Sequence, residues 1–321
     1  MVEKLEQSVS GPCPWLEGGY LPHQEYGHAW PSHLERVQHY SRDVETKWLF
    51  SQYKFLNSSM SLEQFKIIFY WEYIHRIFAR ALGLFFLIFL IYFHFSKKIK
   101  KTYLFTCYFI FTLIVLQGFI GWYMVQSGLV NDITVSHFRL SFHLSTAIVI
   151  ISIIFWLLRN IISNNDKKFF KLSSNNFIFQ MLLLIIFLQI ILGAFVSGLD
   201  AGQIYQTWPQ MGNSFIPDDI ILDNLKSTLD FNSHSLVQFY HRILAYVIIL
   251  YVLCLTIYIY KKKITYLYVP LNILILFLSF QVILGIFTLI SGLNIYLASM
   301  HQIISVLLVL SALNLYYLRT K

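Results

Sequence analysis

Seven runs of mostly apolar residues, each long enough to cross a lipid bilayer as a helix, divide this chain of 321 residues. A span needs about 20 such residues, because the hydrocarbon core is roughly 30 Å thick and a helix rises about 1.5 Å per residue. The runs cover residues 67–93, 103–125, 139–159, 177–198, 236–260, 268–291 and 297–318. We therefore expect an all-α membrane protein with seven transmembrane helices.

The charged residues agree with a membrane protein and orient it. They make up only 12% of the chain, whereas a soluble domain carries roughly 25%. The net charge of +8 comes largely from lysine and arginine in alternate connections, at residues 97–101, 159–171 and 261–263, while the opposite connections carry aspartate. By the positive-inside rule the lysine side, with the C-terminus, is predicted to be cytoplasmic. The basic excess therefore needs no nucleic-acid partner. The three cysteines fit neither a disulfide framework nor a zinc site.

An internal repeat divides the chain into two halves. The residues EYIHR at 72–76 recur as QFYHR at 238–242, and QGFIG at 117–121 recurs as QVILG at 281–285. An offset of four helices restores the same direction through the membrane, so we expect two parallel four-helix-bundle repeats. A further copy, Gln189 with Gly193, opens the second half. Residues 1–66 supply no such helix for the first half, which is therefore predicted to be incomplete. Either that helix has been lost at the start of this reading frame, or the domain works with three helices.

The repeat also sets the expected domain boundaries. They are a polar N-terminal segment at 1–66, a first helical repeat at 67–160, a linker with the fourth helix at 161–198, an external loop at 199–235, and the rest of the second repeat at 236–321.

Four histidines are predicted to share one depth near the external ends of the spans: His75, His143, His241 and His301. A single membrane histidine is adequately explained by a helix-to-helix hydrogen bond or by its reaching the interface. Two per repeat at matching depth favour instead paired axial ligands to haem iron, with one haem in each half. By strict repeat offset His137 is a rival to His143, although it lies at the entrance of its helix.

Charged residues beside these histidines are the next candidates. Arg76, Arg139 and Arg242 lie where their guanidinium groups could bind haem propionates; simple snorkelling at a helix end is the alternative. Glu72 shares a helical face with His75, whereas the second half has Gln238 at the same place. A carboxylate in a span is costly and marks function. We therefore expect the first half to do chemistry and the second to transfer electrons. The glutamine–glycine pattern is interpreted as helix packing alone.

These residues resemble the haem A synthase family, in the branch without external cysteine pairs found in alphaproteobacteria and mitochondria. The resemblance runs from about residue 58 to the C-terminus. It is carried by MSLEQF at 60–65, WEYIHR at 71–76, QGFIGWYMVQSGL at 117–129, VSHFRLSFHL at 135–144, GLDAGQIYQTWPQMG at 198–212, QFYHR at 238–242 and MHQ at 300–302. Family members have eight spans, so the resemblance also implies an atypical N-terminus that lacks the first transmembrane helix.

The resemblance implies a function and a set of roles. Haem O would be bound between His75 and His143 and oxidised at a ring methyl to a formyl group, giving haem A for cytochrome c oxidase. Haem b would be a resident cofactor ligated by His241 and His301, and Glu72 would be catalytic. Expected partners are haem O synthase and cytochrome c oxidase assembly factors, with a homo-oligomer left open. The expected location is the bacterial plasma membrane, ahead of the mitochondrial inner membrane.

Three alternatives stay open on the sequence. A di-haem b-type electron-transfer protein would use the same four histidines without needing Glu72. A transporter with parallel repeats would use the histidines and Glu72 to relay protons and would bind no haem. A truncated synthase without activity would keep the motifs but lack one wall of the substrate site.

Overall fold

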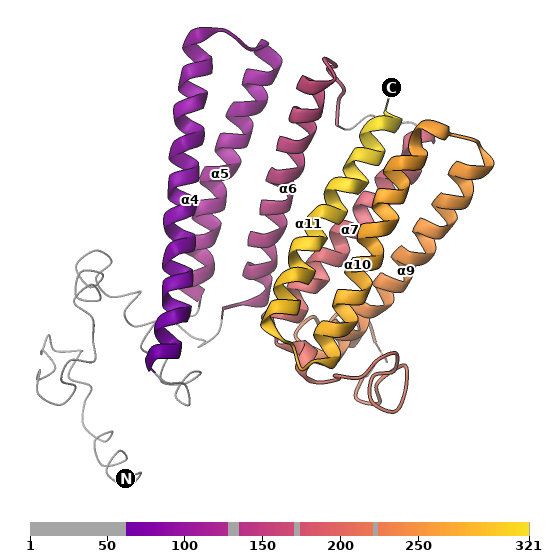
Figure 1. Cartoon of the computed structure of the whole chain (residues 1–321). Coiled ribbons are helices and arrows are strands. Elements are labelled where there is room, and N and C mark those ends of the chain that lie inside the picture. Colours follow the sequence, from indigo (N-terminus) through magenta and orange to yellow (C-terminus); the bar gives the residue numbers. More distant parts are fainter. Residues whose placement is uncertain (1–61, 128–134, 170–173, 221–223, 321) are drawn as a thin grey trace, which may run out of the picture.

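The computed structural model describes residues 62–127, 135–169, 174–220 and 224–320 (Figure 1). Over these ranges the chain is helical and holds no β-strand, only an isolated bridge between Met211 and Ser214. Seven of the described helices are long and apolar enough to cross a membrane, and they match the seven predicted runs to within a few residues. The prediction of an all-α, multi-pass membrane protein is confirmed. The predicted loss of a helix ahead of Glu72 concerns residues that lie outside the described ranges.

The long helices alternate in direction and are joined mostly by short connections. They are α4 (Leu62–Ser96), α5 (Lys101–Ser127), α6 (His137–Ile162), α7 (Ser174–Gly198), α9 (His234–Lys261), α10 (Tyr268–Ile290) and α11 (Ile295–Arg319). The short elements are η2 (Ala201–Gln203), α8 (Leu225–Thr228) and η3 (Thr265–Leu267). A helix suits each apolar segment because it satisfies every backbone N–H and C=O internally, where lipid offers no partner.

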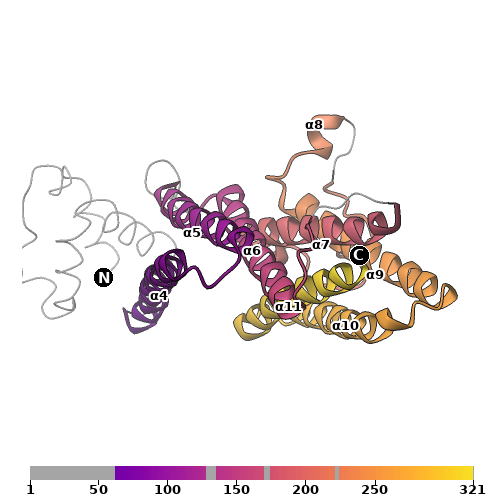
Figure 2. The same cartoon turned by 90° about the horizontal axis from the view of Figure 1, so that it is seen from above.

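The helices form two unequal groups. Helices α7, α9, α10 and α11 pack into a bundle that holds most of the buried apolar core. Helix α6 packs on α7 and α11, α5 packs on α6, and α4 packs on α5, so that α4 stands at the end of the row in Figure 2. Only 6% of the residues in the apolar stretch of α4 are buried, against 28% of those in the apolar stretch of α7. Helix α4 is therefore the edge of the described molecule.

The connections gather at two ends of the molecule. Figure 1 shows the α4–α5, α6–α7 and α9–α10 connections at the same end as the C-terminus, and the long α7–α9 loop with the α10–α11 turn at the other. The three lysine-rich connections thus share one end, as the charge pattern predicts. In the α10–α11 turn, Gly292 adopts a left-handed φ of 70°, and Asn294 caps α11 by accepting from the N–H groups of Tyr296 and Leu297.

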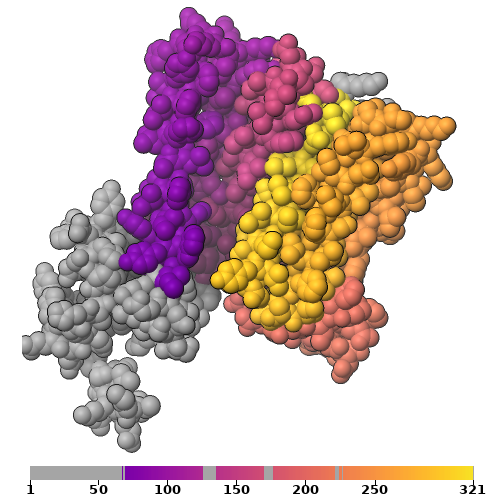
Figure 3. All heavy atoms as spheres, in the orientation of Figure 1, coloured from indigo at the N-terminus to yellow at the C-terminus, as the bar shows by residue number. Residues whose placement is uncertain are grey.

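The surface is hollowed where the two groups meet. In the face drawn in Figure 3, a recess separates α4 from α11, and more distant atoms of α5 and α6 form its floor. The walls of this recess belong to different halves of the repeat.

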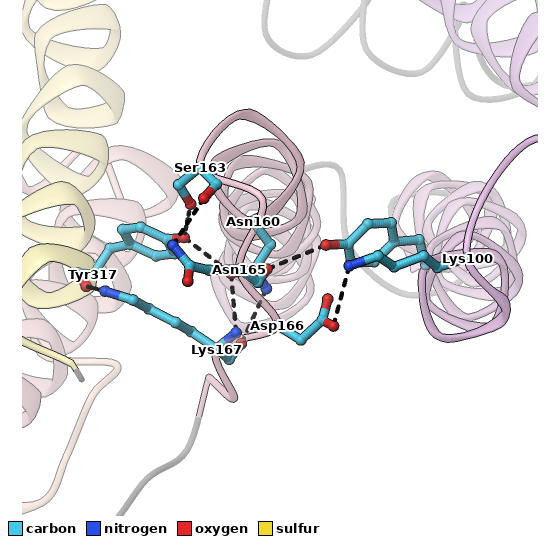
Figure 4. Close-up of polar contacts among 8 residues, drawn as sticks. Lys100, Asn160, Ser163, Asn165, Asp166, Lys167 and Tyr317 are labelled. Atoms are coloured by element: carbon cyan, nitrogen blue, oxygen red, sulfur yellow. Dashed lines mark hydrogen bonds and ion pairs between the residues drawn. The ribbon is translucent and has the colours of Figure 1, made fainter.

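A polar network at the lysine end ties the linker after α6 to both neighbours (Figure 4). On one side Lys100 pairs with Asp166 at 3.3 Å. On the other side the Lys167 ammonium donates to the carbonyl of Tyr317 at 3.0 Å, and the Tyr317 hydroxyl donates to Asn160 Oδ1 at 3.1 Å. Asn160 in turn donates to the carbonyl of Lys167 at 3.0 Å. The linker is therefore hydrogen-bonded to α6 and to the last turns of α11.

Tyr317→Phe should destabilise the protein through this network. The Tyr317 side chain is 1% exposed, and its hydroxyl also contacts Ser163 Oγ, so the change removes hydrogen bonds that link α11 to the end of α6. We expect a loss of about 1–2 kcal/mol, seen as a lower thermal midpoint of the detergent-solubilised protein. Tyr296→Phe, at the other end of α11 and 77% exposed, is the matched control. Equal losses in the two variants would contradict the role of the network.

Candidate functional site

The four predicted histidines lie near the same end of the molecule, that of the α7–α9 loop. His143, His241 and His301 lie about two turns from the starts of α6, α9 and α11, and His75 lies equally far into the apolar stretch of α4, which begins at Phe69. His75 and His143 lie on α4 and α6, in the first half, and His241 and His301 lie on α9 and α11, in the second half. Each half therefore contributes two histidines, and their pairing as ligands stays a prediction.

Three of these histidines rest on a glutamine and a glycine of a neighbouring helix, an arrangement we call a glutamine–glycine cradle. The cradles consist of Gln117 with Gly121 on α5, Gln189 with Gly193 on α7, and Gln281 with Gly285 on α10, and they hold His143, His241 and His301 respectively. The sequence interpretation treated this pattern as helix packing. The structure adds that what packs against each glycine is the ring of a candidate ligand.

The contacts in the cradles are close. A Cβ added at Gly121 or at Gly193 would lie 3.1 Å from the Cε1 atom of the imidazole, and one at Gly285 only 2.9 Å. The amide nitrogen of Gln189 lies 3.2 Å from Nδ1 of His241, and that of Gln281 lies 3.2 Å from Nε2 of His301. Glycine at these positions therefore makes room for the ring.

His137 occupies a different environment. It is 8% exposed, and its ring packs edge-on against Phe195 at a centroid distance of 5.5 Å. Its backbone and Cβ lie so close to α7 that a Cβ on Gly198 would come within 2.8 Å of its Cα. His137 is therefore packed in the contact between α6 and α7, whereas the ring of His143 packs against α5. This geometry favours His143 over its rival as the ligand.

The charged residues of the first half contact their own helices and neighbours. Glu72 and Arg76 form an ion pair at 3.8 Å along α4. Arg139 donates to the carbonyl of Tyr123 at 2.9 Å and stacks on the ring of that residue, with its guanidinium carbon 3.8 Å from the centroid. Both arginines lie at the end of the molecule that carries the histidines, and contact with a haem propionate stays a prediction for them.

In the second half the equivalent residues hold the external loop. Arg242 donates to the carbonyls of Tyr205 at 2.7 Å, Thr207 at 2.8 Å and Gln210 at 3.2 Å. Gln238, which is 2% exposed, donates to the same Tyr205 carbonyl at 2.9 Å. The residues that correspond to the Glu72–Arg76 pair therefore bind backbone here. The sequence did not reveal this role, because nothing in it shows which carbonyls the loop presents to α9.

A second set of hydrogen bonds attaches a later part of the external loop to α9. Asp219 accepts hydrogen bonds from Tyr205 at 2.7 Å and from Ser235 at 2.5 Å. Burial raises the pKa of the Asp219 carboxyl, but the hydrogen bonds from Ser235 and Tyr205 outweigh it, and the pKa lies below its ordinary value. Because the folded pKa is depressed, this contribution to stability is present at neutral pH and is lost as the pH falls through that pKa.

Arg242→Gln should loosen the external loop. Hydrogen bonds from a charged donor contribute about 1.5–3 kcal/mol each, and the variant loses most of the three donated by Arg242. We expect amide hydrogen exchange at residues 205–212 to accelerate by at least about tenfold, since about 1.4 kcal/mol is a factor of ten. Lys261→Gln, at the opposite end of α9, is the control. Unchanged exchange in Arg242→Gln would show that the loop is held by other contacts.

The arrangement suits haem better than a bare metal ion. Among the residues that the structure describes, no group of three or more His, Cys, Asp or Glu side chains could hold a metal ion. The imidazoles instead come in twos, the number that axial ligation of a haem uses. Buried polar atoms without a partner also gather around the rings, namely His143 Nδ1 and the Oε1 atoms of Gln117, Gln189 and Gln281. These residues fit a pair of haem groups.

The fold and the site define a multi-pass helical membrane protein with paired histidines near one end. The model of the COX15-CtaA family, described as "Cytochrome oxidase assembly protein", matches residues 26–313, and the chain belongs to this family. It is 47% identical over 261 residues to a protein of Pelagibacter ubique named Heme A synthase, covering 81% of this chain and 76% of that one. Proteins of the same name from Rickettsia bellii and Rickettsia canadensis are 39% and 38% identical, covering 81% and 84% of this chain and 77% and 80% of theirs.

Proposed function

We propose that this protein is a haem A synthase, an oxidoreductase that converts a ring methyl of haem O to a formyl group. The observation that carries the proposal is the placement of two histidines of each half at the same depth near one end of the molecule, in a chain of this family. His75 and His143 would bind the substrate haem O. His241 and His301 would ligate haem b. Bound there, haem b supplies one-electron redox chemistry, an outlet for the electrons removed from the substrate.

The residues around the first pair suit an exchangeable substrate. His75 is exposed on α4, the least buried helix, and the recess between α4 and α11 opens on one face of the molecule (Figure 3). His241 and His301 are both partly buried and lie inside the four-helix bundle, beneath a loop that Arg242 and Gln238 fasten. A bound group at the second pair would therefore be retained, while one at the first could enter and leave.

Glu72 is the proposed catalytic residue. It lies one turn from His75 on the same face of α4, and its side chain is 33% exposed. Oxidation of a methyl group releases protons, and a carboxylate beside the substrate can accept one or stabilise developing positive charge.

The proposed setting is the bacterial plasma membrane, with the lysine end and the C-terminus cytoplasmic and both histidine pairs near the external face. Haem O synthase, as the source of substrate, and assembly factors of cytochrome c oxidase, as acceptors of product, are the proposed partners.

Haem extraction after expression tests the proposal. The protein would be produced in a bacterial host that makes haem O but has no haem A synthase, and its haems would be separated by chromatography and identified by mass. Haem A in the membranes, with haem b on the purified protein, is the expected result. Haem b alone would favour a di-haem electron carrier. A colourless protein would favour a transporter or an inactive synthase.

A further inference from the structure

The glutamine and glycine of each cradle are four positions apart in the sequence, and helix geometry explains this spacing. A helical side chain covers the turn on the N-terminal side of its own Cα. A glycine at position i+4 therefore leaves uncovered the backbone of residue i, which in each cradle is the glutamine. The spacing opens a notch and exposes the glutamine carbonyl at its floor.

A ring nitrogen uses that carbonyl in the cradle of His301. Nδ1 of His301 lies 3.1 Å from the backbone oxygen of Gln281. When Nδ1–H of His301 donates to this carbonyl, the ring is fixed in one tautomer, and Nε2 keeps its lone pair. The Gln281 amide contacts Nε2 at 3.2 Å, and haem iron would take the lone pair in place of that contact.

The amides of the glutamines strengthen the attachment. Gln117 and Gln189 donate to the backbone carbonyls of His143 and His241, at 2.9 and 3.0 Å, so each amide bridges to the helix that carries the histidine. In all three cradles the amide Oε1 atom is buried without a partner. This oxygen is an acceptor available to a neighbouring imidazole N–H once the amide rotates.

We propose that the three cradles are positioning devices for the haem-ligating histidines, an inference that rests on the proposed function above. Gly121, Gly193 and Gly285 admit the rings, the glutamine four residues earlier orients each ring, and the carbonyl of Gln281 also sets the tautomer of His301. The cradles differ between the halves. His301 donates to a carbonyl, whereas Nδ1 of His143 is buried without a partner. The resident haem thus has a ligand with a preset tautomer, and the substrate site has a ligand that is set less firmly.

Glycine-to-alanine variants test the proposal, with a matched control on the chain itself. An added methyl at Gly285 or Gly193 meets Cε1 of a histidine that cannot move away while it ligates iron. Gly118, three residues before Gly121, has open space where its Cβ would be, so Gly118→Ala is the control. Alanine favours a helix more than glycine does, so a loss of haem in the variants would not reflect weaker helices.

The measurement is the haem b content of purified protein, the spin state from its absorption spectrum, and the elution volume as a check on folding. We expect Gly193→Ala and Gly285→Ala to bind haem b about 10–100-fold more weakly, the usual effect of disturbing the partners of metal ligands. Retained haem should be partly converted from low spin to high spin. Gly118→Ala should match the unchanged protein.

The outcomes separate this inference from the proposed function. Haem b in the unchanged protein with equal content and spin state in all three variants would overturn the cradle proposal and leave the proposed function standing. An equal loss in Gly118→Ala would also overturn it. An unchanged protein without any haem would overturn both. Variants that misfold are replaced by Gln281→Ala, which keeps the carbonyl and should keep a low-spin haem with a shifted midpoint potential; an unshifted potential would contradict the role of the amide.

Discussion

His241→Ala should leave the purified protein with less than about a tenth of its haem b and should abolish the formation of haem A. Disturbing even the outer partners of a metal ligand weakens binding 10–100-fold, and this change removes a ligand itself. His301→Ala should behave in the same way, because the two histidines belong to one four-helix bundle. Haem b content and haem A formation are both measured, since the two sites should respond differently.

His75→Ala and His143→Ala complete this experiment. They should abolish haem A formation while leaving haem b in place, because they lie on α4 and α6, in the other half of the repeat. His94→Ala is the control, since His94 lies at the opposite end of α4, where its Nδ1 is 2.6 Å from the Tyr108 hydroxyl. If His75→Ala removed haem b and His241→Ala did not, the two halves would have the opposite roles.

The spans and the shared depth of the four histidines could be predicted from the sequence because both depend on position along a single helix. Apolar length fixes a span, and depth follows from distance to the end of the span. The repeat then supplies the pairing, since the order of helices is the same in both halves. His143 and His301 illustrate this, each lying on the last helix of its half.

The contacts between helices could not be predicted in the same way. A glutamine and a glycine four residues apart are compatible with any close helix pair, and only the three-dimensional arrangement shows that His143 rests on Gly121. A propionate contact of Arg242 stays a prediction, whereas the carbonyls that it binds in the structure belong to a loop whose path the sequence does not reveal. Nothing in the sequence indicates the role of Tyr317 in the polar network, because a tyrosine at a helix end is usual in membrane proteins.

Glu72→Gln should strongly reduce the formation of haem A, because Glu72 is a residue in which the first half differs from the second, which has Gln238. Glu72→Gln gives the first half the side chain that the second half already has, with nearly the same size and no charge. We expect haem A formation to fall by about 10²–10⁴-fold, the usual contribution of a general acid or base, with haem b content and stability unchanged. The measurement is the ratio of haem A to haem O in membranes at equal protein level.

Gln238→Ala is the matched control for that experiment. Gln238 donates to the Tyr205 carbonyl, so its loss should loosen the external loop and leave most of the activity. Activity that survives Glu72→Gln and disappears in Gln238→Ala would place the chemistry in the second half. Glu72 is ion-paired with Arg76, whereas Gln238 and Arg242 both donate hydrogen bonds to the backbone of the external loop. The same two helical positions therefore hold an ion pair in the first half and attach the loop in the second. We propose that a repeat that keeps its histidines and changes these contacts, together with the cradles, can hold one haem permanently and act on the other.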